Sequence, residues 1–192
     1  VDAIPAGNAI LFLQKAKRKI RELAYNFDSD GYVAPDLTIL NDTVTKSGIN
    51  EMVYQQEPDS IIWCVRDDGE LAGLTYQRSE NVVAWHRHIF GGAFGSGNSV
   101  CESAASISGT LTEDELWVIV KRTINGATKR YVECFSDFDF DETTATDFKF
   151  LDSHLNYSGS ATTTLSGLSH LEGQTVSILA DGSVHANKVV SS

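Results

Sequence analysis

Three short turn signals, each ending in glycine, constrain the fold of this chain more than any other feature of its sequence. They are Asp68-Gly69, Asn125-Gly126 and Asp181-Gly182, and each lies between two runs rich in apolar and β-branched residues. Tight hairpin turns require residues that tolerate positive φ angles, and Gly, Asn and Asp tolerate them best. The sequence therefore predicts antiparallel hairpins at these sites and a mainly β fold.

The same hairpin plan recurs along the first two thirds of the chain. We expect strands at 10–13 and 20–25, then at 60–66, 71–76 and 82–89, and finally at 116–120 and 129–135. The apolar starts of these units, Ile10, Ile61 and Leu116, are about 50 to 55 residues apart, a period that occurs in propeller-like arrays of antiparallel blades. A closed propeller would need more blades than these three units.

Other segments predict less regular structure. Asp36 is placed to cap one short helix over residues 37–44, and the glycine-rich run 91–98 predicts a mobile loop. Beyond residue 135, short runs at 148–151, 161–164, 175–179 and 184–190 predict a small β-barrel or sandwich module, truncated or completed near Ser192. We therefore expect a hairpin-repeat domain over 1–135 and a second module over 136–192.

Charge and composition exclude several classes of protein. The net charge is −11, from 26 acidic and 15 basic residues, and a broadly acidic surface binds phosphate backbones poorly. No run of 18 apolar residues exists, so no membrane-spanning helix is expected. The start lacks the pattern of a signal peptide and an initiator Met. With an end directly after a strand-like run, this favours a fragment of a longer chain.

The three cysteines, Cys64, Cys101 and Cys134, are scattered, and no two have the C-x-x-C spacing. Cys64 and Cys134 lie within apolar strand-like runs, where we expect reduced side chains packed in the sheets. This pattern favours folding in a reducing cytosol over a disulfide scaffold.

Two clusters are candidates for an interaction surface. Trp85, His86 and His88 lie on one predicted strand, which places the two histidines on the same face. Such a pair can bind a metal ion, but no third ligand is near in sequence, and polar residues on an exposed strand face are the simpler interpretation. The basic run of Lys15, Lys17, Arg18 and Lys19 could face DNA, although such runs are mostly solvated turns.

No motif predicts catalysis or a cofactor. The acidic run 137–142 resembles a calcium loop but has Glu142 where an EF-hand requires glycine. The glycine-flanked serines lack the G-x-S-x-G elbow, and no phosphate-binding loop is present. Carboxylates are abundant, but sequence cannot set two of them at the separation a glycosidase needs. No catalytic, cofactor-binding or metal-binding residue is therefore assigned.

Several long sequence segments are more specific than a β fold requires. They are 54–76, continuing into 82–88, then 115–126, 130–133, 170–176 and 179–182. Together they resemble phage and prophage tail proteins of the nozzle or tubular type, over about residues 10–190. Some members of that family carry a label for an FCCH-like domain, which describes a small β-barrel and implies no ubiquitin chemistry.

The resemblance implies a structural, non-enzymatic virion component, assembled in the bacterial cytoplasm and located in the tail. Its partners would be other tail subunits, including further copies in a ring, with DNA passing transiently through the conduit. The wall of this conduit would be made rigid by three buried tryptophans, Trp63, Trp85 and Trp117. An acidic inner surface would repel DNA and so let it slide. Two alternatives are a host-surface glycan-binding tail module and a tail-associated glycoside hydrolase.

Overall fold

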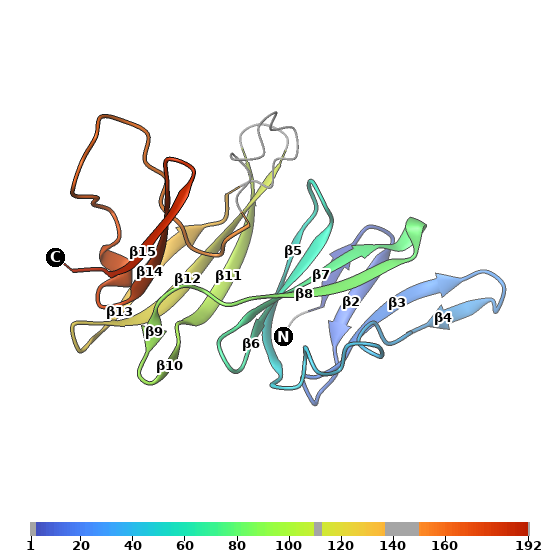
Figure 1. The fold of residues 1–192 in the computed structure, drawn as a ribbon. Helices are drawn as coiled ribbons and strands as arrows, with labels where there is room; N and C mark the ends of the chain where they lie inside the picture. Colours follow the sequence, from blue (N-terminus) through green and yellow to red (C-terminus); the bar gives the residue numbers. More distant parts are fainter. Residues whose placement is uncertain (1–2, 110–112, 137–149, 192) are drawn as a thin grey trace.

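The structure, a computed structural model, describes residues 3–109, 113–136 and 150–191 (Figure 1). Its regular elements are nearly all β-strands. Within the described ranges the helical segments are two single turns, η1 at Arg78–Glu80 and η2 at Ser169–Leu171. No helix in this part of the chain is long and apolar enough to cross a membrane. The predicted mainly β fold is confirmed.

The first sheet has four antiparallel strands in chain order. They are β1 (Ile4–Ala6), β2 (Ala9–Leu13), β3 (Ile20–Asn26) and β4 (Gly31–Val33). The predicted first hairpin is β2–β3. Along β3, Ile20, Glu22 and Ala24 are buried while their neighbours are not, as expected for a strand with one covered face.

The central sheet is formed by the next four strands, again antiparallel and in chain order. They are β5 (Ile49–Gln55), β6 (Ile61–Arg66), β7 (Leu71–Gln77) and β8 (Val82–His88). The β6–β7 hairpin turns through Gly69, whose φ of 87° confirms the predicted turn. The sequence did not predict β5, in which a register shift between Ile49 and Glu51 interrupts the alternation.

The third sheet has three antiparallel strands, β11 (Val100–Ser108), β12 (Asp114–Ile124) and β13 (Ala127–Cys134). Asn125 and Gly126 join β12 to β13 with φ angles of 50° and 76°, the double positive φ of a tight hairpin turn. This confirms the predicted third unit. The first strand, β11, was not predicted because small polar residues interrupt its apolar pattern.

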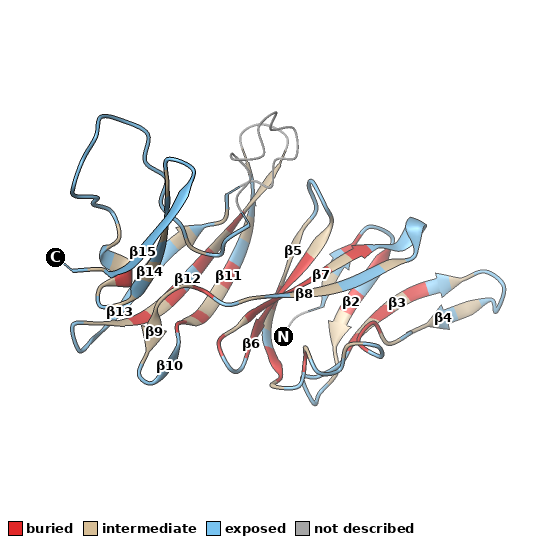
Figure 2. Ribbon diagram, viewed as in Figure 1, coloured by how far each residue is buried: buried red, intermediate tan, exposed pale blue. Residues whose placement is uncertain are grey.

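Two further hairpins complete the described structure. The pair β9 (Ala93–Phe94) and β10 (Gly97–Asn98) is short, and the pair β14 (Thr175–Ala180) and β15 (Ser183–Val189) turns at Asp181-Gly182 as predicted. Every residue of β15 is exposed, which Figure 2 shows in pale blue. Across the described ranges no sheet closes into a barrel or propeller.

The three larger sheets stack face to face, with β5–β8 in the middle (Figure 1). A first core lies between the first and central sheets and includes Leu11, Ile20, Ile62 and Leu74. A second core lies between the central and third sheets and includes Trp63, Leu71, Leu116, Val118 and Val120. The central sheet is therefore covered on both faces.

This double burial explains the unbroken apolar run of β6. Ile62 and Cys64 point into the first core, and the alternate residues Trp63 and Val65 point into the second. Side chains alternate between the faces of a strand, so a strand covered on both sides needs apolar residues at successive positions. Five of the six residues of β6 are buried.

The predicted helix over 37–44 is wrong, because this segment forms successive turns. Asp36 does accept the backbone N–H of Thr38 at 2.9 Å, as a cap would. However, Glu22 donates its N–H to Pro35 at 3.2 Å and Leu37 donates to Ile20 at 3.0 Å. These bonds tie the segment to the edge of β3, and Ile39 and Leu40 are left exposed without a buried helical face.

The glycine-rich run 91–98 was predicted to be a mobile loop, but it contains the β9–β10 hairpin. Gly92 has a φ of 102°, and a Cβ there would lie 2.8 Å from the side chain of Arg122. Glycine is therefore required for close packing here. Further along, 161–164 is not a strand, nor are 150–151, while 148–149 lie outside the described residues.

Three side chains expected to be buried are more accessible than predicted. Cys64 is buried, but Cys134 is exposed on β13. Trp63 is buried, whereas Trp85 and Trp117 are half-buried. Trp85 lies on β8, the edge strand of the central sheet, and Trp117 lies on the face of β12 opposite the second core, so neither indole is enclosed on all sides.

The double-sided core predicts equal sensitivity on the two faces of β7. Leu71 and Leu74 are fully buried in the second and first core, respectively. We expect Leu71→Ala and Leu74→Ala each to lower the free energy of unfolding by about 2–5 kcal/mol, measured by urea denaturation. The control Leu179→Ala, at a largely exposed site on β14, should change it little. A small loss at either buried leucine would contradict the three-layer packing.

Candidate functional site

The predicted basic cluster forms the turn between β2 and β3, which we call the basic turn (residues 14–19). Gln14 donates its N–H to the carbonyl of Lys19 at 2.9 Å, and Lys17 donates to Gln14 at 2.8 Å. Lys17 occupies the left-handed region at a φ of 60°. All four basic side chains are exposed, so the interpretation as a solvated turn is confirmed.

Two of these basic side chains are engaged within the fold. Lys17 Nζ donates to Asn50 Oδ1 at 2.6 Å and lies 3.9 Å from Asp67. Lys19 Nζ lies 2.8 Å from Asp36 Oδ2. Desolvation alone would raise the pKa of Asp36, but hydrogen bonds from Lys19 and Thr38 outweigh it and lower the pKa to about 2.

Trp85 and the two histidines of β8 lie on opposite faces of the central sheet. Trp85 packs against the first core, and its Nε1 donates to the carbonyl of Leu37 at 3.0 Å. His86 and His88 contact the ring of Trp63, which belongs to the second core. The predicted interaction surface is thus divided between two faces and is also separate from the basic turn.

The two histidines form a polar chain that reaches the C-terminal segment. His86 Nδ1 and His88 Nε2 share a hydrogen bond of 2.9 Å, and His88 Nδ1 shares one of 2.5 Å with Asp152 Oδ1. The ring of Phe135 contacts both Trp63 and His88. These residues, the histidine junction, connect β6, β8 and two segments that follow the third sheet. Both histidines are half-buried. The prediction that they lie on an exposed strand face is therefore wrong.

The backbone of β7 makes room for this junction. Gly73 lies opposite His86 in the sheet, and a Cβ at Gly73 would lie 2.1 Å from His86 Cε1. Real Cβ atoms cannot approach this closely, so the imidazole occupies the space that a side chain would fill. Burial, followed by the charge of His88, lowers the pKa of His86 to about 4.

The histidine junction does not have the geometry of a metal site. Ligand nitrogens must converge on one point about 2.0–2.1 Å away, but here both ring nitrogens of His88 are used in hydrogen bonds. Among the residues that the structure describes, no group of three His, Cys, Asp or Glu side chains could hold a metal ion. The acidic run 137–142, considered as a calcium loop, lies outside the described residues.

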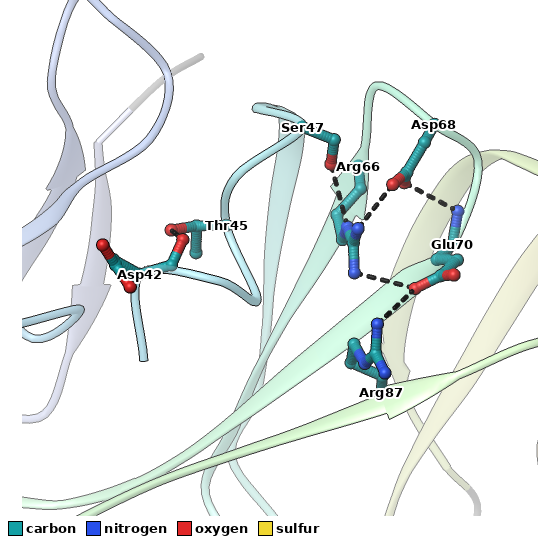
Figure 3. A network of polar contacts seen from close by, with 7 residues as sticks. All are labelled: Asp42, Thr45, Ser47, Arg66, Asp68, Glu70 and Arg87. Carbon is teal, nitrogen blue, oxygen red and sulfur yellow. Dashed lines mark hydrogen bonds and ion pairs between the residues drawn. The ribbon is translucent and has the colours of Figure 1, made fainter. Parts of the chain in front are cut away.

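A second polar network holds the β6–β7 turn in place (Figure 3). Arg66 is buried, and its guanidinium donates to Ser47 Oγ at 3.0 Å, to Glu70 Oε2 at 2.8 Å and to Asp68. Arg87 reaches the same Glu70 oxygen at 3.5 Å but is about half exposed. One buried cation therefore organises the whole turn.

A third network lies where β12 passes the β9–β10 hairpin. Arg122 is fully buried, donates through Nε to the carbonyl of Gly91 at 2.7 Å and forms a two-pronged pair with Glu133. Its guanidinium also lies 5.5 Å from the centre of the Tyr131 ring. A buried arginine with this many partners is satisfied, and its role is to join β12, β13 and the glycine-rich segment.

A shallow hollow at the end of β5 is lined by two carboxylates, one of which is bonded to the backbone. Asp114 and Glu57 both line the hollow. However, Asp114 Oδ2 accepts the backbone N–H groups of Gln56 and Glu57 at 2.9 and 3.1 Å. Asp114 therefore holds the β5–β6 turn onto β12.

The arginine at the β6–β7 turn provides a matched test. We expect Arg66→Met to lower the free energy of unfolding by about 3 kcal/mol, because it leaves two carboxylates without their buried partner. Arg87→Met, which removes a half-exposed cation from the same Glu70, should cost no more than about 1 kcal/mol. Chemical denaturation measures both. Equal losses would show that Arg66 does not organise the turn.

The histidine junction predicts a pH dependence of stability. The pKa of His86 is lowered to about 4 in the folded chain, while the unfolded chain takes up this proton near its ordinary pKa of about 6.5. Stability from this group is thus complete above about pH 6.5 and is lost as the pH falls towards 4. We expect His86→Gln to reduce the loss over this window by up to about 3 kcal/mol.

Urea denaturation at several pH values measures this difference. The control is His185→Gln, which removes an exposed histidine of β15 and should leave the pH profile unchanged. An identical profile for His86→Gln and the unmodified chain would contradict the assignment.

Sequence reasoning missed the two buried arginines and Asp152. The only sequence signal for Arg66 was that a basic residue ends an apolar strand. Arg122 likewise follows an apolar run near the end of β12. Nothing near Asp152 in sequence indicated its contact with His88, 64 positions away.

A scan against protein-family models and a search of curated proteins found no match to this chain.

Proposed function

We propose that this chain is a structural component of a bacteriophage tail, part of the wall of a nozzle or tubular conduit for DNA. The observation that carries the proposal is the stack of three antiparallel sheets, with a central sheet buried on both faces. Such a stack is stiff because both cores must be disrupted before a sheet can slide. The resemblance of long sequence phrases to tail proteins adds independent support.

The use of the polar groups also fits a wall component. Arg66, Arg122, Asp114 and His88 each bond to a segment outside their own hairpin. Enzymes place such groups at a pocket with perturbed acid–base properties and leave them accessible to substrate. Here the same groups form hydrogen bonds that connect one element to another. A subunit that must resist mechanical force requires such connections.

The charge of the chain suits a conduit through which DNA passes. With a net charge of −11, a wall built from these subunits repels phosphate groups and lets DNA slide without sticking. In this proposal the partners are other tail subunits and further copies of the protein, and the location is the virion tail.

Immunogold electron microscopy of purified phage particles tests the proposal. An antibody raised against this chain is applied to particles released from the bacterium that carries the gene. We expect gold at the tail and none at the head. The same antibody, pre-absorbed with the purified chain, should label nothing.

The contrary outcome is equally clear. Intact particles without gold, together with free antigen in the same lysate, would remove the chain from the virion and overturn the proposal.

A further inference from the structure

The turn between β3 and β4 presents a cluster of exposed aromatic rings, which we call the aromatic tip (residues 25–32). This hairpin extends at the right of Figure 1, away from the other sheets. Tyr25, Phe27 and Tyr32 are 44%, 88% and 75% exposed. Three large rings gathered at one exposed turn are unusual, and such clusters mark interaction sites.

The tip is ordered by contacts within itself. Tyr25 makes edge-to-face contacts with Phe27 and Tyr32, with ring centres 5.9 and 5.6 Å apart. Its hydroxyl donates to Asp30, and the side chain of Asn26 accepts the backbone N–H of Ser29 at 3.1 Å. A surface held in shape before binding loses little conformational entropy when a partner arrives.

The chemistry of the tip favours a cationic partner. Asp28 and Asp30 are exposed beside the rings, and no basic side chain occurs between residues 22 and 46. Aromatic faces attract ammonium and guanidinium groups, and adjacent carboxylates strengthen the attraction.

The chain carries a surface of matching chemistry in its basic turn. Lys17 and Lys19 are engaged with Asn50 and Asp36, but Lys15 and Arg18 are exposed and form no ion pair within the described ranges. These two cations are available to a partner.

The two surfaces cannot meet within one molecule. The basic turn precedes β3 and the aromatic tip begins at the last residues of this strand, so they lie at opposite ends of a seven-residue strand, roughly 23 Å apart at the usual rise of a strand. We propose that the aromatic tip of one copy binds the basic turn of a second copy through Lys15 and Arg18. Such a head-to-tail contact uses two different surfaces, so it can continue from copy to copy.

The contact goes beyond membership of a phage tail, because it depends only on the exposure and charge of these two turns. Sedimentation velocity of the purified chain over a range of concentrations tests it. We expect reversible association that weakens as salt is raised from about 50 mM to about 500 mM, because exposed charges are screened.

Charge reversal provides the sharpest test. Asp28→Lys with Asp30→Lys makes both surfaces positive, and Lys15→Glu with Arg18→Glu makes both negative. Each double variant alone should associate at least about tenfold more weakly than the unmodified chain. An equal mixture of the two should regain association, because each tip then meets a turn of opposite charge.

Matched controls reverse the same number of charges elsewhere on the exposed surface. They are Asp59→Lys with Glu80→Lys, and Lys129→Glu with Lys188→Glu. These variants should associate like the unmodified chain. Phe27→Ser with Tyr32→Ser should also weaken association by at least about tenfold, since it removes the ring faces that receive the cations.

Three outcomes would overturn the proposal. One is a chain that stays monomeric at about 500 µM in low salt, where weak contacts of this size are populated. Another is a mixture of the reversed variants that fails to associate. The third is a monomeric chain whose tip binds a glycan array through Phe27 and Tyr32, which would assign the patch to a saccharide. None of these would alter an immunogold result at the tail.

Discussion

The burial of the central sheet on both faces is the constraint on which the rest of the structure depends. Because β6 and β7 must satisfy two cores at once, neither strand can shift by one residue without exchanging the side chains of the two cores. This fixed register positions the β6–β7 turn, and with it the cluster around Arg66. It also fixes Gly73 opposite His86, which makes room for the histidine junction.

The buried polar groups follow from the same stacking. A stack of antiparallel sheets leaves turns and edges where apolar residues cannot cover every contact, and there Arg66, Arg122 and His88 connect elements through several hydrogen bonds each. Groups used in this way hold separate elements together. The surfaces left for partners are therefore the turns, and the basic turn and the aromatic tip stand at opposite ends of β3.

Prediction from sequence succeeded where local chemistry decides the structure and failed where packing does. The hairpins at Gly69, Asn125-Gly126 and Asp181-Gly182 were predicted because few residues accept their φ angles. The strands β5 and β11 were missed because their polar residues obscure the period. The helix over 37–44 was wrong because its backbone bonds to the edge of β3, a competition that no local pattern reveals.

The sequence by itself determined that the chain is built from antiparallel hairpins and that its two histidines share one face of a strand. It could do so because turn residues and strand alternation act over a few neighbouring positions. Only the tertiary structure decided that Trp85 and His86 serve different sheet faces and that Asp152 completes the histidine junction. These relations join residues far apart in the chain, and they arise when separate sheets pack, not when single strands form.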